Sequence, residues 1–188
     1  MLEIGNGHQN KTEYTTQFSL WCIAKANLLL GCDLSQPSVM NGTEADAFEI
    51  ILNPEAIAIS QDPLAMPASL VGHAASAASQ TADAVEVWSG PLVGGAKVLL
   101  FLNAGNAVAE DVSFSLLELE FPSNVTDVNC RDLWLHAACT GGGHAGGVPI
   151  PLRGNITVTV AVHGVVLLRL TPSRSNSGNG TTCSSILN

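Results

Sequence analysis

The apolar residues in the first third of the chain follow a helical or continuous pattern. They are densest between residues 18 and 34. Over residues 20–26 they occupy almost every helical face, which predicts a helix buried on several sides. Residues 28–30 then form a continuous apolar run, which predicts a strand covered on both faces. A buried helix that leads directly into a buried strand is typical of an α/β protein.

Shorter elements flank this segment. Residues 1–7 are expected to end a strand and enter a glycine turn, and Thr12 is a candidate N-cap for the helix that follows. Residues 43–52 carry the stripe of a second amphipathic helix, which Asn53 and the proline after it interrupt. Residues 55–60 place isoleucines in alternation and are followed by an Asp-Pro turn.

The pattern changes to period two in the second half of the chain. Residues 67–83 are rich in Ala and Ser and show no clean period, so we expect a linker or an irregular insertion there. A change of phase at Leu117 suggests a bulge. Many short strands joined by Gly and Pro turns predict an antiparallel sandwich or barrel. The predicted strands cover residues 85–88, 97–103, 112–116, 117–121, 125–135, 155–163 and 165–171.

Several stretches resemble a known enzyme family. Residues 1–7 (Met-Leu-Glu-Ile-Gly-Asn-Gly), the dense segment 18–34 and residues 59–64 (Ile-Ser-Gln-Asp-Pro-Leu) follow one another in the order and at about the spacing of the end of the catalytic barrel of the α-galactosidases, glycoside hydrolase family 27. The family's β-sandwich motifs are similar to residues 85–92, 131–134 and 163–172. The resemblance therefore spans most of residues 1–172.

The resemblance implies an α/β plus all-β fold. Residues 1–66 would form the last two βα units of a (β/α)8 TIM barrel, and residues 84–172 an antiparallel β-sandwich. The Ala/Ser-rich residues 67–83 would link them. Residues 173–188, rich in Ser, Gly and Asn, are expected to be a disordered tail. The family differs at Asn27, Ser60 and Ala65, which are tolerable loop and cap changes.

The resemblance also implies a function. The family removes terminal non-reducing α-D-galactosyl residues with retention, using two aspartates from earlier barrel strands, so both catalytic carboxylates are expected upstream of Met1. Met1 matches a methionine that lines the galactose site and is the one substrate-binding residue that carries over. We expect Met1 to be an internal methionine of a longer protein, and expect the chain to be inactive alone.

Two alternatives stay open. One is a non-catalytic β-sandwich protein that binds sugar or a partner, although Trp88 and Trp134 lie in predicted strands and fit a core role equally well. The other is α-N-acetylgalactosaminidase activity, whose determinants lie in earlier loops.

Charge and hydropathy exclude several partners. The net charge is −9 with only seven Lys and Arg, so a basic patch for nucleic acid is not expected. The longest apolar run is broken by Lys25, Asn27 and Asp33 and is too short to span a membrane. We expect no cofactor and no bound metal.

The chain carries the marks of a secreted or vacuolar/lysosomal protein. Five Asn-x-Thr sequons are candidate glycosylation sites: Asn10, Asn41, Asn124, Asn155 and Asn179. No signal peptide is visible at the start. Five Cys is an odd number, and Cys130 with Cys139 is the best disulfide pair on spacing, whereas Cys22 and Cys32 fit a packing role.

Other candidate groups have plainer interpretations. Glu118 and Glu120 would share the solvated face of one strand. Glu44, Asp46 and Glu49 surround a helix start. Asp33 is favoured as a turn residue over a catalytic one. Cys130, His136, Cys139 and His144 lack the spacing of a metal finger. The glycine run 141–147 is not a phosphate loop, and His8, His73 and His163 have no partner visible in sequence.

Overall fold

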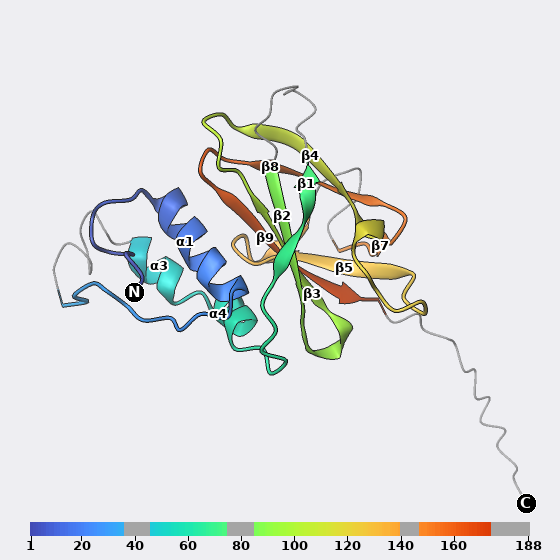
Figure 1. Cartoon of the computed structure of the whole chain (residues 1–188), viewed down its shortest axis with the longest axis horizontal. Helices are drawn as coiled ribbons and strands as arrows, with labels where there is room; N and C mark the ends of the chain where they lie inside the picture. Colours follow the sequence, from blue (N-terminus) through green and yellow to red (C-terminus); the bar gives the residue numbers. More distant parts are fainter. Residues whose placement is uncertain (36–45, 75–84, 140–146, 174–188) are drawn as a thin grey trace, which may run out of the picture.

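A computed structural model describes residues 1–35, 46–74, 85–139 and 147–173. Its described part has three layers. Helices α1, α3 and α4 cover one face of a large antiparallel sheet, and a two-stranded sheet covers the other face (Figure 1). Asn41, Glu44, His144, Asn179 and the predicted tail from residue 174 onward lie outside the described residues.

The helical layer begins with α1 (Lys11–Ile23). Asn10 is its N-cap in place of Thr12: the Asn10 side chain accepts a hydrogen bond from the Glu13 backbone, and the Glu13 side chain accepts one from the Asn10 backbone. The helix also ends earlier than predicted, at Ile23. Tyr14, Phe18 and Cys22 face the core.

The remaining helices are short. Helix α3 spans Asp46–Ile51, and α4 spans Pro54–Ser60. The alternating isoleucines of residues 55–60 therefore lie in a helix and not in a strand. Asn53 caps α4 by accepting hydrogen bonds from the backbone of Glu55 and Ala56, and the proline at the first helical position fits a helix start.

The predicted buried strand at residues 28–30 is also not observed. Leu30 forms a single parallel bridge with Leu2, and the side chains of Leu29 and Leu30 are 58% and 38% exposed. An apolar run becomes a strand covered on both faces only where neighbouring strands and helices lie beside it. The described residues supply one neighbour, so the barrel units stay a prediction.

The large sheet has the strand order β1-β2-β3-β9-β5-β6, and β7 also pairs with β5; β4 pairs with β8 in the second sheet. All of these pairs are antiparallel, which confirms the antiparallel sandwich. The strands are β1 (Ser69–Ala74), β2 (Val85–Pro91), β3 (Lys97–Leu102), β4 (Ala109–Ser115), β5 (Asp127–Asp132), β6 (Ala137–Ala138), β7 (Ile150–Pro151), β8 (Asn155–Val160) and β9 (Val165–Pro172).

Three details differ from the sequence predictions. Strand β1 lies inside the segment 67–83 that was expected to be a linker, at the edge of the large sheet. Residues Leu116–Glu118 form a 3-10 turn, so the strand predicted at residues 117–121 is not observed, and the change of phase at Leu117 comes from this turn instead of a bulge. The register shift of β4 lies between Ala109 and Val112. A second 3-10 turn spans Val93–Gly95.

Alternate residues of the large sheet serve two cores. In β3, Val98 and Leu100 pack toward the helices, whereas Leu99 and Phe101 pack toward β4 and β8. This is the two-sided burial that a sheet covered on both faces requires. The edge-to-face pair of Phe101 and Phe114, with ring centroids 6.3 Å apart, joins the two sheets.

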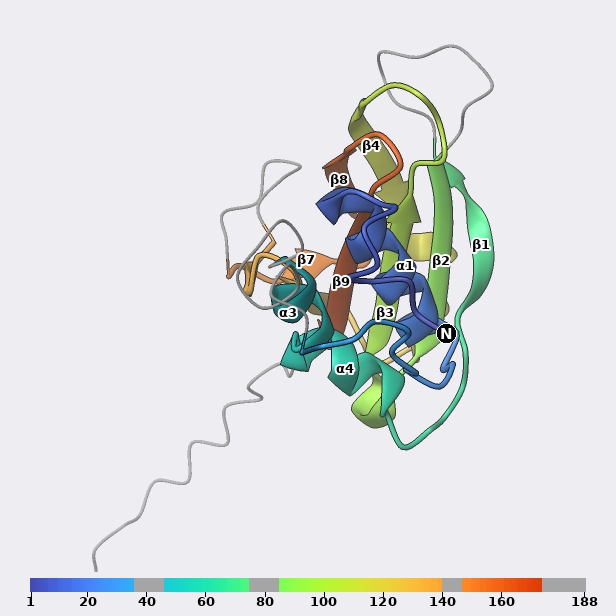
Figure 2. The same ribbon diagram turned by 90° about the vertical axis from the view of Figure 1, so that its left-hand side faces the viewer.

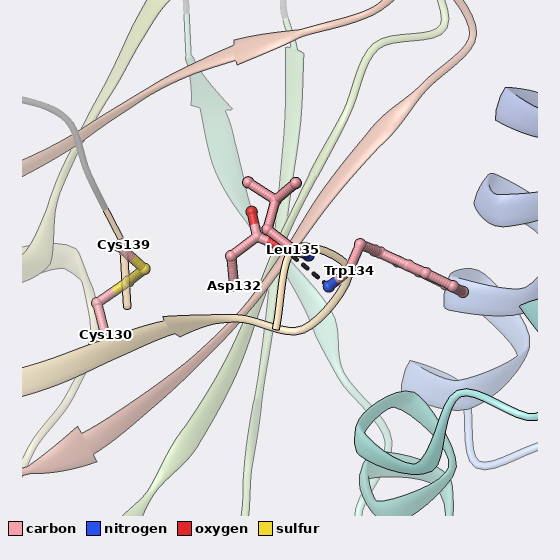
Figure 3. Close-up of a disulfide and its surroundings, with 5 residues drawn as sticks. All are labelled: Cys130, Asp132, Trp134, Leu135 and Cys139. Atoms are coloured by element: carbon pink, nitrogen blue, oxygen red, sulfur yellow. Dashed lines mark hydrogen bonds between the residues drawn. A yellow bond between two sulfur atoms is a disulfide. The ribbon is translucent and has the colours of Figure 1, made fainter. Parts of the chain in front are cut away.

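The turn after β5 holds the helical layer against the sheet. Figure 3 shows the Trp134 side chain reaching from this turn toward the helices. Its ring meets Phe18 edge to face at 6.3 Å, and its Nε1 donates a hydrogen bond to Ser19 Oγ at 2.9 Å. Asn53 Nδ2 donates to the Leu133 carbonyl at 2.9 Å. Trp134 thus lies in a turn instead of the predicted strand, and it is half-buried against the core of the helical layer.

Candidate functional site

Two short parallel segments, one around Leu2 and one around Leu30, lie side by side at their carboxyl ends. Leu2 N donates to the Leu29 carbonyl at 2.7 Å, and Gly31 N donates to the Leu2 carbonyl at 3.0 Å. Beyond this pair, the backbone of Gly5 lies close to the Cys32 side chain. In parallel α/β architectures, functional groups gather at such carboxyl ends. This edge is therefore the candidate site.

Two glycines allow this close approach. A Cβ atom on Gly31 would lie 2.6 Å from the Leu2 carbonyl oxygen, which no side chain tolerates without a backbone shift. Gly5 has φ +88°, in the left-handed region, and a Cβ there would lie 3.1 Å from Cys32 Sγ. The backbone geometry at this edge therefore favours glycine at both positions.

The acidic groups at the edge are engaged in local turns. Asp33 Oδ1 accepts hydrogen bonds from Ser35 N at 2.9 Å and Ser35 Oγ at 2.7 Å, which confirms its turn role. Glu3 Oε2 accepts from Asn6 Nδ2 at 2.8 Å. A retaining glycosidase needs two carboxyl groups about 5 Å apart, facing the scissile bond. These hydrogen bonds of Glu3 and Asp33 are instead local, to Asn6 and Ser35.

Met1 lies at the same edge. It is 76% exposed, and its Cβ is 3.6 Å from the position that a Cβ on Gly31 would take. The side chain is therefore available to a molecule bound in front of the strand ends. Its role in substrate binding stays a prediction.

The other acidic candidates belong to the surface. Asp46 and Glu49, on α3, bind Lys11 Nζ at 3.1 and 2.6 Å and raise the pKa of that amine. They thus connect α3 to α1. Glu118 and Glu120 are exposed, but Glu118 belongs to the 3-10 turn and Glu120 follows it, so they do not share a strand.

Cys130 and Cys139 form a disulfide, which confirms the pairing predicted on spacing (Figure 3). With both thiols bonded, the metal alternative loses two of its four proposed ligands. Within the described ranges, no group of three or more His, Cys, Asp or Glu side chains could hold a metal ion. Cys22 is buried in α1, and burial raises the pKa of its thiol to about 12, which suits a packing role.

Among the acidic residues in the described ranges, Glu55 has the most strongly shifted pKa. Arg131 donates to it through Nε at 2.5 Å and Nη2 at 2.7 Å, and His136 Nδ1 lies 2.7 Å from its Oε1. The Arg131 guanidinium, followed by His136, lowers the pKa of Glu55 to about 2. Because these groups join α4 to β5 and the turn after it, their role is to hold the two layers together.

His163 has partners that were not visible in sequence. Its Nδ1 lies 3.5 Å from Glu13 Oε1, its Nε2 lies 3.4 Å from Asn106 Oδ1, and its carbonyl accepts a hydrogen bond from Thr16 Oγ1 at 2.8 Å. The loop between β8 and β9 therefore lies against the first half of α1 (Figure 2). A contact between residues 147 positions apart leaves no local signal in the sequence.

Three of the five sequon asparagines fall in the described residues, and all three are exposed: Asn10, Asn124 and Asn155. Asn10 caps α1 through its side-chain oxygen, which leaves the nitrogen as the atom that a glycan would use. Glycosylation at these sites stays a prediction. The described part of the chain contains no helix long and apolar enough to cross a membrane.

Comparisons with known proteins agree with this architecture. Residues 82–170 match the family model described as the alpha galactosidase C-terminal beta sandwich domain. The α-galactosidase of Coffea arabica is 34% identical over 172 residues, which are 92% of this chain and 39% of that protein. Alpha-galactosidase 3 of Arabidopsis thaliana is 39% identical over 141 residues, which are 74% of this chain and 29% of that protein.

A solved structure extends the agreement to the fold. The crystal structure of α-galactosidase I from Mortierella vinacea superposes with a TM-score of 0.71 at 28% identity, covering 93% of this chain and 40% of that one. The fold and these matches define a β-sandwich of the glycoside hydrolase class together with the helices that pack against it. The chain belongs to the α-galactosidase family, and it spans about two fifths of the length of the relatives from Coffea arabica and Mortierella vinacea.

Proposed function

We propose that this chain is the C-terminal part of a retaining glycoside hydrolase of family 27 that removes terminal α-D-galactosyl groups from oligosaccharides, galactolipids or glycoproteins. The observation that carries the proposal is the extent of the match. Similarity covers 92% of the chain and therefore extends well beyond the sandwich match at residues 82–170. A sugar-binding sandwich alone would not require the strand ends or the helices.

In the proposed enzyme, the residues of this chain position the site, and the two catalytic carboxylates lie on barrel strands upstream of Met1. One carboxylate attacks the anomeric carbon to form a galactosyl-enzyme intermediate, and the other acts first as acid and then as base. The edge formed by Gly5, Gly31 and Cys32 closes one side of the sugar pocket. Met1, exposed at this edge, contacts the galactose.

The sandwich supports this edge through α1 and α4. Trp134 packs on Phe18, and Asn53 joins α4 to the turn after β5. Because a pocket residue must be held within a fraction of an ångström of its productive position, a rigid sandwich behind the helices is a functional requirement. We further propose a secreted or vacuolar enzyme, which the exposed sequons Asn124 and Asn155 support.

The test uses the chain extended upstream through a complete barrel. We expect it to release nitrophenol from a p-nitrophenyl α-galactoside faster than from the corresponding N-acetyl-α-galactosaminide, with α-galactose as the first product by NMR. Asp33→Asn in the same extended chain is the matched control and should retain activity, because Asp33 serves a turn. The proposal fails if the extended chain does not hydrolyse the α-galactoside, if it hydrolyses the N-acetyl-α-galactosaminide faster, or if β-galactose appears first.

A further inference from the structure

A tight turn follows the parallel pair at the candidate site. Asn6 N donates a hydrogen bond to the Glu3 carbonyl at 3.0 Å, and Gly5, the third residue of the turn, has φ +88°. A left-handed φ at the third position is typical of a type II turn. Because the turn comes directly after Leu2, its shape decides how the chain leaves the strand end.

Gln17, on α1, holds the first end of this turn. Its Oε1 accepts a hydrogen bond from Glu3 N at 3.1 Å. The carbonyl of the same peptide unit, that of Leu2, accepts one from Gly31 N at 3.0 Å. Because the N–H and C=O of a trans peptide unit point in opposite directions, this unit is fixed between α1 and the neighbouring segment. Met1 lies one residue before it.

Tyr14, also on α1, holds the second end. Gly7 N donates to the Tyr14 hydroxyl at 2.8 Å, and Tyr14 is 2% exposed. Packing of the ring alone would be served equally well by phenylalanine, so the hydroxyl has a separate task. Tyr14 and Gln17 are three residues apart and share one face of the helix. One face of α1 therefore holds both ends of the turn.

We propose that Gln17 and Tyr14 are positioning residues of the sugar pocket. They fix the backbone on which Met1 is carried, and they act through that backbone without contacting the sugar. Met1 is 76% exposed, so packing does little to hold its side chain, and its place depends on the backbone bonds beside it. This inference rests on the proposed function, in which Met1 contacts the galactose.

The two contacts are tested in the ¹⁵N-labelled 188-residue chain by NMR. Tyr14→Phe removes the acceptor of Gly7 N and keeps the ring, whereas Gln17→Met removes the acceptor of Glu3 N at nearly constant volume. We expect the Gly7 amide signal to move most in Tyr14→Phe and the Glu3 amide signal to move most in Gln17→Met. Unmoved signals in both variants would overturn the inference.

The positioning role is tested in the chain extended upstream through a complete barrel. In Tyr14→Phe and Gln17→Met, the KM for p-nitrophenyl α-galactoside and the inhibition constant of galactose should rise together about fivefold, as for one lost hydrogen bond. The kcat should stay within about twofold, because a contact made equally in the ground and transition states changes binding alone. Gln17→Glu keeps an acceptor oxygen and should restore the wild-type constants.

Thr16→Val is the matched control. It removes a hydrogen bond of 2.8 Å that the same helix makes to the His163 carbonyl, on the side of the sandwich. Both constants should stay unchanged in this variant. An equal rise in Thr16→Val would overturn the inference, because the effect would then follow from weaker attachment of α1.

The remaining outcomes separate this inference from the proposed function. If the extended wild-type chain is active and both constants are unchanged in Tyr14→Phe and Gln17→Met, the positioning role is overturned and the proposed function stands. A fall in kcat with an unchanged KM in these variants overturns the positioning role as well. An inactive extended wild-type chain overturns the proposed function and this inference with it.

Discussion

Replacement of Asn53 by alanine tests how the helical layer is attached to the sandwich. Asn53 is 3% exposed and makes two kinds of contact. Its Oδ1 accepts hydrogen bonds from Glu55 N at 2.9 Å and Ala56 N at 3.1 Å, which caps α4. Its Nδ2 donates to the Leu133 carbonyl at 2.9 Å, which joins that helix to the turn after β5.

The two contacts give the expected magnitude. Loss of an N-cap costs about 1 kcal/mol. A buried carbonyl left without its donor costs roughly 1–3 kcal/mol, and Leu133 is 1% exposed, so water does not readily replace the amide. Asn53→Ala should therefore lower the free energy of unfolding by roughly 2–4 kcal/mol.

The assay is urea unfolding followed by far-UV circular dichroism and tryptophan fluorescence. Asn53→Asp separates the two contacts, because it keeps the cap acceptor and removes the donor to Leu133. Asn27→Ala, an exposed asparagine, is the matched control and should change stability by less than about 0.5 kcal/mol. A loss below about 0.5 kcal/mol for Asn53→Ala would refute this description of the junction.

Three further predictions concern stability. Glu55 has a folded pKa of about 2 against an ordinary 4.5. Its stabilising contribution is therefore complete above pH 4.5 and is lost as pH falls toward 2. In Glu55→Gln, the free energy of unfolding should depend less on pH in that window. Removing the Cys130–Cys139 disulfide should cost roughly 2–3 kcal/mol in urea unfolding, and reductant should then have no further effect. Gly31→Ala should cost about 1–3 kcal/mol, since its Cβ meets the Leu2 carbonyl, and an unchanged unfolding midpoint would contradict the strand pair.

Most of the sandwich could be predicted from the sequence because its strands alternate. Val112 and Phe114 are buried while the serine between them is exposed, so β4 has the alternation of buried and exposed residues that its sequence predicts. Strand β1 could not be found in this way: it lies at a sheet edge and buries only Ala74, so its sequence carries no alternation.

The helical layer shows where local patterns mislead. The isoleucines of residues 55–60 fit a short strand and a short helix equally well, since a six-residue window does not separate the two periods. The asparagine and proline at 53–54 carried the deciding signal, because a cap followed by proline marks a helix start. The partners of Glu55 and His163 are 76 and 150 residues away, and only the fold brings them together.

The central proposal is that this chain is scaffold for an α-galactosidase and does not carry the hydrolytic carboxylates. The most direct measurement is the release of nitrophenol from a p-nitrophenyl α-galactoside by the purified 188-residue chain, beside its Asp33→Asn variant. The account predicts no turnover by either protein. Hydrolysis by the chain that Asp33→Asn abolishes would contradict the account, because Asp33 would then be catalytic instead of a turn residue.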